Sequence, residues 1–176
     1  MAHFDFRNLE AATRTNMIAE IDHDVAQARL YLSPRLTSEG LSAWEAKLKA
    51  ACETGDDQSL EASLGLPGGP FLEDRESDTN NGGTKAVPSN AATVLAQGEF
   101  NRFYIRALCL RAIEEARGLR IYRARMSSRP DAASESKIGA SLDPHDLLAD
   151  LRQRPGIASA MGLPPRPNSG LSVELT

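Results

Sequence analysis

A long apolar helical pattern in the middle of the chain constrains the fold more than any other feature. It begins at Ser89 or Asn90 and runs to Arg117, and Gly118 behind it is typical of a helix end. Its second part, 99–117, is apolar around well over half of its circumference, through Phe100, Phe103, Tyr104, Ala107, Leu108, Leu110 and Ile113. A helix of this kind has to be surrounded by protein. The pattern therefore predicts a fold built around this segment, with Gly98 as the point where the helix could divide.

Shorter amphipathic patterns on both sides predict helices that pack against this centre. They cover about 8–32, 37–53, a short stretch after Asp56 or Asp57, and 143–153. The side chains expected to face the core are Ile18, Ile21, Val25, Ala28, Leu32, Leu41, Trp44, Leu48, Leu60, Leu64, Leu147, Leu148 and Leu151. Asp143 followed by Pro144 is a sharp helix start, because aspartate caps a helix and proline fits its first position.

Alternating residues predict one short β element beside the helices. In 119–126, Leu119 and Ile121 fall on one face and Arg120 on the other, as in a strand with one buried face. The run 170–175 also alternates and is suited to pair with 119–126 or with the sheet edge of a neighbouring subunit. The expected fold class is mostly α: a compact helical bundle with one short β element, an extended loop and a tail.

The domain organisation follows from where glycine and proline gather. We expect a single domain with N-terminal helices in 1–64, an acidic Gly/Pro loop in 65–88, the central helix, strand and short helix in 89–153, and a Pro-rich C-terminal arm in 154–176. The loop lacks periodicity, so it is expected to be exposed, either as a mobile loop or as an arm that becomes ordered on a partner. Residues 127–142 are expected to form a second loop.

The basic residues are distributed very unevenly along the chain. Eight arginines and three glutamates give 99–130 a net charge of +5, although the whole protein carries −4. The eight are Arg102, Arg106, Arg111, Arg117, Arg120, Arg123, Arg125 and Arg129. A cationic centre between acidic flanks favours binding to acidic surfaces, including those of other copies of the chain.

The arginines differ in what can neutralise them. Helical spacing predicts pairs of Glu99 with Arg102, Glu115 with Arg111, and Glu114 with Arg117. The remaining five have no local acidic partner within 99–130. This leaves three alternatives: acidic residues of the first two helices or the acidic loop, acidic surface on a neighbouring subunit, or nucleic-acid phosphate. The residues expected to make intermolecular contacts are Arg106, Arg120, Arg123, Arg125, Leu171, Val173 and Leu175.

No motif predicts a catalytic residue, a cofactor or a metal ion. The spacing Glu20-Ile-Asp-His23 resembles half of a di-iron site, but no second pair of this kind occurs, so a solvated acidic helix face is expected. Cys52 and Cys109 lie on apolar helical faces and are expected to be buried thiols in a reducing compartment. No apolar run is long enough for a membrane span, and the N-terminus does not resemble a signal peptide.

Three segments resemble small proteins encoded in the structural gene clusters of tailed bacteriophages and prophages. They are the string 99–106 (EFNRFYIR), the strand 122–125 (YRAR) and the ending 167–173 (PNSGLSV), within a similarity that covers about 99–125 and 162–175. The resemblance implies a virion or assembly component, made in the host cytoplasm and present in multiple copies. We therefore expect a non-enzymatic structural or interaction protein that contacts itself or other virion proteins. We also expect that deletion of 163–176 abolishes assembly while the helical body stays folded. The alternative is a nucleic-acid-binding or regulatory protein that contacts phosphates through the 102–129 arginines.

Overall fold

The computed structural model of the chain describes residues 3–126, 131–154, 160–162 and 169–176. The helices are α1 (Ala11–Ala26), α2 (Ser38–Thr54), α3 (Asp57–Leu64), α4 (Ala91–Glu114), α5 (Ala132–Glu135) and α6 (Pro144–Gln153). The strands are β1 (Arg75–Ser77), β2 (Thr84–Ala86), β3 (Leu119–Arg123), β4 (Ser141–Leu142) and β5 (Leu171–Leu175). The predicted class, mostly α with a small β element, is confirmed.

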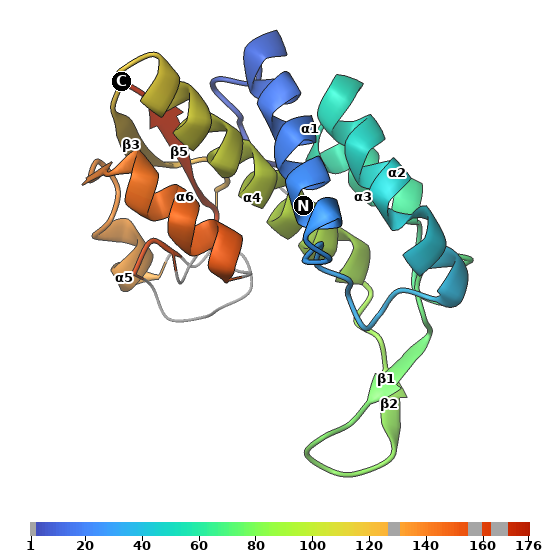
Figure 1. The fold of residues 1–176 in the computed structure, drawn as a ribbon. Coiled ribbons are helices and arrows are strands. Elements are labelled where there is room, and N and C mark those ends of the chain that lie inside the picture. The colour runs from blue at the N-terminus through green and yellow to red at the C-terminus, as the bar shows by residue number, and fades with distance from the viewer. Residues whose placement is uncertain (1–2, 127–130, 155–159, 163–168) are drawn as a thin grey trace.

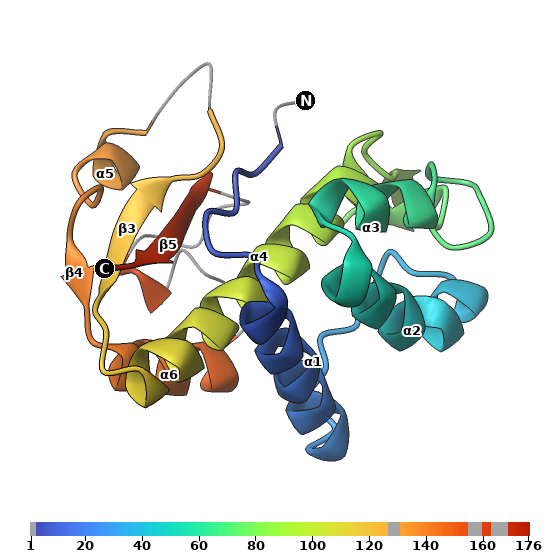
Figure 2. The ribbon, with the colours of Figure 1, turned by 90° about the horizontal axis from the view of Figure 1, so that it is seen from above.

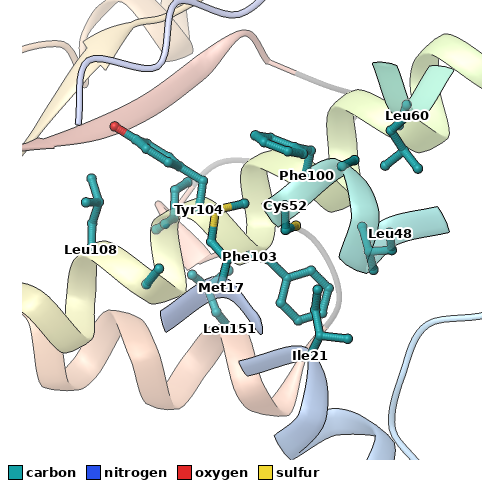
Figure 3. Close-up of a cluster of buried hydrophobic side chains, with 14 of the residues drawn as sticks. Met17, Ile21, Leu48, Cys52, Leu60, Phe100, Phe103, Tyr104, Leu108 and Leu151 are labelled. Carbon is teal, nitrogen blue, oxygen red and sulfur yellow. The ribbon is translucent and has the colours of Figure 1, made fainter. Parts of the chain in front are cut away.

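The central helix α4 is continuous through Gly98 and contributes more buried apolar side chains than any other described element. Figure 2 shows α1 crossing its middle, α2 and α3 beside its N-terminal half, and the sheet and α6 beside its C-terminal half. In Figure 3 its aromatic side chains Phe100, Phe103 and Tyr104 meet Met17 of α1 and residues of the other helices. These three aromatic side chains are fully buried, as the apolar pattern predicted.

Most of the predicted helix starts are confirmed, but the buried face of α1 was predicted correctly only in part, at Ile21. Thr37, Asp56 and Asp143 cap α2, α3 and α6 through their side chains. In α1, by contrast, Val25 is 38% exposed, whereas Glu20 and Asp24 are buried. The acidic face was expected to be solvated. It turns inward because α4 supplies an arginine that neutralises it.

The C-terminal strand is paired within its own chain. The order of the larger sheet is β4-β3-β5, with both neighbours antiparallel to β3 and Ile121 opposite Val173. The outer edge of β5 is also occupied, because Asn101 Nδ2 donates to the Leu171 carbonyl at 2.8 Å and Leu175 N–H donates to Asn8 Oδ1 at 3.0 Å. Strand β5 is therefore part of this fold. The second loop, 127–142, was also predicted too simply, since its described part contains α5 and β4.

The outer part of the acidic loop is a β hairpin, where the sequence predicted no regular structure. Strands β1 and β2 are antiparallel, with Glu76 opposite Lys85, and they project from the helical body (Figure 1). Gly82 and Gly83 in the turn have φ of 72° and 77°, values that favour glycine. The alternation that marks longer strands is absent from three-residue strands exposed on both faces, so periodicity could not reveal them.

Two further predictions concern the C-terminal arm and the membrane. Much of the predicted Pro-rich arm, 155–159 and 163–168, lies outside the described residues. Among the helices that the structure describes, none is long and apolar enough to cross a membrane.

Candidate interaction site

Arg106, the first predicted contact residue, lies in the interior. Its side chain is 0% exposed, and its Nε donates to Glu20 Oε2 at 2.7 Å. Its Nη1 and Nη2 donate to the two carboxylate oxygens of Asp24 at 2.6 and 2.8 Å. Glu20 and Asp24 lie one turn apart on α1, so their side chains face the same guanidinium group. Of the alternatives considered, the acidic residues of the first helix are the partner of Arg106.

Two more arginines extend this arrangement into a buried charge network. Arg152 of α6 donates through Nε to Glu20 Oε2 at 3.0 Å and through Nη2 to Oε1. Arg102 donates through Nη2 to Glu99 at 2.8 Å, and the same nitrogen lies 3.6 Å from Asp24. The network thus joins α1, α4 and α6 and balances three guanidinium groups with three carboxylates. We refer to Glu20, Asp24, Glu99, Arg102, Arg106 and Arg152 as the buried charge network.

The carboxyl groups of the network have shifted pKa values. Burial by itself raises the pKa of Glu20 and of Asp24, but hydrogen bonds from Arg152 and Arg106 outweigh it and lower both pKa values. For Glu99, burial outweighs the neighbouring charge of Arg102, and the pKa is raised. Glu20 and Asp24 are therefore held as carboxylates at neutral pH, whereas burial makes the charged form of Glu99 costly.

The other arginines of the 102–129 cluster are also matched by groups of their own chain where the structure describes them. The predicted pairs of Arg102 with Glu99 and of Arg111 with Glu115 are present. Arg117 lies 3.5 Å from Glu115, not beside Glu114. The remaining contacts join Arg111 to Glu10, Arg120 to Glu174, Arg123 to Glu135, and Arg125 to the ring of Phe4. Arg129 lies outside the described residues.

The predicted contact residues of the C-terminal strand belong to the core. Leu171 and Val173 are 0% exposed, and Leu175 is almost fully buried. The prediction that deleting 163–176 leaves the helical body folded is wrong on physical grounds, because the deletion removes these side chains and the hydrogen bonds to Asn101. None of these three side chains is exposed, so they do not support an interface role for this strand.

Among the described elements, the β1–β2 hairpin is exposed and available to a partner. From Thr79 to Ala86 every residue is exposed. The hairpin is fixed at its base by the Arg35 side chain, whose Nε donates to Glu76 at 2.6 Å, and by Val87 N–H, which donates to the Asp74 carbonyl. The sheet contains only these two strands, so each strand has an open edge. Sequence reasoning placed the acidic segment on the surface but missed its strands.

The described side chains form neither a metal-binding cluster nor a site with a reactive thiol. In the ranges that the structure describes, no three His, Cys, Asp or Glu side chains gather closely enough to hold a metal ion. Cys52 and Cys109 are free and buried, as expected, and burial raises the pKa of both thiols. A thiol with a raised pKa is a poor nucleophile.

Comparisons with known proteins place the chain in no family. No protein-family model matches it, and no curated protein or solved structure matches it significantly.

Proposed function

We propose that this chain is a non-enzymatic structural protein that assembles in multiple copies, as a component of a tailed-bacteriophage particle. The observation that carries the proposal is the projecting β1–β2 hairpin, which is anchored at its base through the half-buried Glu76 and is exposed from Thr79 to Ala86. The sequence resemblance to phage structural proteins suggests the kind of particle, and the hairpin supplies the surface through which subunits would associate.

A hairpin of this kind is expected to bind a partner because it is only marginally stable by itself. A two-stranded hairpin without an apolar face is marginally stable in water. Its open edges carry unpaired backbone N–H and C=O groups, which a strand from a partner can satisfy. Carboxylates at Glu73, Asp74, Glu76 and Asp78 give it a mainly acidic surface, so a partner with basic residues beside a strand edge fits it.

The nucleic-acid alternative has less support. Arg102, Arg106 and Arg111 are engaged by carboxylates within the chain, and the exposed Arg120 faces Glu174. Nucleic-acid binding needs several guanidinium groups exposed on the surface, and Arg102, Arg106 and Arg111 are buried.

The experiment is a comparison of solution masses. Replacing Ser77 to Thr84 with Asn-Gly gives a two-residue turn and keeps the Arg35–Glu76 contact at the base. We expect the intact chain to form an oligomer by light scattering and the shortened variant to be a folded monomer of about 18 kDa, given the 19.0 kDa of the intact chain.

A second variant separates strand pairing from charge. It keeps the full hairpin but changes Asp74 and Asp78 to Asn, and weaker yet detectable assembly is expected because the strand edges remain. An intact chain that is monomeric at all concentrations, or a shortened variant that assembles as the intact chain does, would refute the proposal. Salt-dependent DNA binding by a monomer would favour the nucleic-acid alternative.

A further inference from the structure

We infer that the arginine-lined hollow where α1, α4 and α6 meet is a binding site for small organic phosphates. The hollow contains no residue of the hairpin, and the inference does not depend on the proposed assembly. The hollow has a volume of about 380 Å³ and is lined by Arg29, Tyr31, Arg102, Arg152 and Gln153. Three of its five lining residues are therefore arginines, from three different parts of the fold.

Each of these arginines has N–H donors that no residue described by the structure accepts. Arg102 is 4% exposed, and its hydrogen bonds to Glu99 come from Nε and Nη2. Arg152 likewise uses Nε and Nη2 on Glu20. In both side chains Nη1 makes no hydrogen bond to any described residue. Arg29 follows α1 on the exposed rim, and its side chain forms no ion pair within the described part of the chain. An anion in the hollow can accept hydrogen bonds from all three.

The charge balance favours an anion in this place. The buried charge network is neutral when all six of its groups are charged, so Arg29 gives the network and the hollow together a net charge of +1. Burial raises the pKa of Glu99, and any protonation of that carboxyl makes the lining more positive. A phosphate oxygen pair matches the planar fork of a guanidinium group better than it matches an ammonium group, which favours phosphate as the ligand of three arginines.

A neighbouring groove suits the organic part of such a ligand. It has a volume of about 370 Å³ and shares Tyr31 with the arginine-lined hollow. Much of its floor is apolar, through Ala91, Val94, Leu95 and Gly98 of α4. The carboxylates at its rim, Glu76 and Glu99, are paired with Arg35 and Arg102. A phosphomonoester with a compact apolar group therefore fits with its phosphate beside the arginines and its apolar group beside Tyr31.

Two probes and three variants of the full chain test this inference by titration calorimetry. Phenyl phosphate is expected to bind saturably and about tenfold more tightly than inorganic phosphate, because burial of the ring adds to the phosphate contacts. Arg29→Ala should weaken both probes by about tenfold, a loss in the range of one charge-assisted hydrogen bond. Arg117→Ala removes an equal charge at the far end of α4 and should leave both affinities unchanged.

The third variant tests the groove separately. A Cβ at Gly98 would meet no atom within 4 Å, so Gly98→Leu can be accommodated and fills the groove. It should remove the advantage of phenyl phosphate while inorganic phosphate binds as before. Absence of saturable binding of phenyl phosphate, or equal effects of Arg29→Ala and Arg117→Ala, would overturn the inference. Neither result bears on the hairpin, so the site and the proposed assembly can fail separately.

Discussion

Replacement of Arg106 by methionine should be among the most damaging single changes in this protein. The substitution keeps a long apolar side chain and deletes the cation that joins Glu20 to Asp24. Removing one partner of a buried ion pair typically costs about 3–5 kcal/mol, because the remaining charge stays desolvated. Without Arg106, Arg152 still binds Glu20 through two nitrogens. The nearest guanidinium group left to Asp24 is that of Arg102, at 3.6 Å. We therefore expect a loss near the lower end, about 3 kcal/mol.

The loss of stability caused by this substitution should depend on pH. In the native protein the pKa values of Glu20 and Asp24 are lowered, so the stability that they contribute is present above their ordinary values and is lost as the pH falls through the lowered ones. Without Arg106, burial dominates at Asp24 and raises its pKa. The loss of stability of the variant relative to the native protein should therefore become smaller as the pH falls from 7 to 5.

Urea unfolding followed by circular dichroism measures both effects. Arg120→Met is the matched control, because Arg120 is 51% exposed and its pair with Glu174 is worth at most about 1 kcal/mol. Adding Asp24→Asn to Arg106→Met should recover part of the loss by removing the buried charge. Equal destabilisation by Arg106→Met and Arg120→Met, or a double variant less stable than Arg106→Met, would refute this reasoning.

Three other predictions concern the C-terminal strand and the thiols. Deletion of 171–176 should abolish cooperative unfolding, and a truncated chain with a native-like melting transition would contradict the role of β5 in the core. Asn101→Ala should cost about 1–3 kcal/mol in urea unfolding, since it removes a donor to Leu171 and an acceptor for Ser172; a loss below about 0.5 kcal/mol would argue against this bridge. Burial raises the pKa of Cys52 to about 12, so neither it nor Cys109 should react with a thiol reagent at pH 8 unless urea is added, and fast reaction of the native protein would be inconsistent with the core.

Local signals in the sequence predicted much of the fold. The long apolar pattern identified α4 as the central helix, and aspartate or threonine at the starts of α2, α3 and α6 predicted their boundaries. These features could be predicted because helix periodicity and capping depend on residues close together in the chain. The short strands of the hairpin lack such periodicity, and their pairing joins 75–77 to 84–86 through a turn that glycine permits.

The candidate site depended on contacts between distant residues. Glu20 and Asp24 lie one turn apart, a spacing that predicts a common helix face but not whether solvent or an arginine faces it. The partner, Arg106, follows about eighty residues later, so only the packing of α1 on α4 brings the three together. For the same reason the sequence could not distinguish a C-terminal strand that pairs within its chain from one that pairs with a neighbour.

Hydrogen exchange of the hairpin amides tests the central claim most directly. The amides of 75–86 would be compared between a concentrated solution and one diluted below the assembly range, with the amides of α4 as an internal reference. If the hairpin is the contact between subunits, its exchange should slow markedly in the assembled state while exchange in α4 stays the same. Exchange from the hairpin that is equally fast in both solutions would contradict the account.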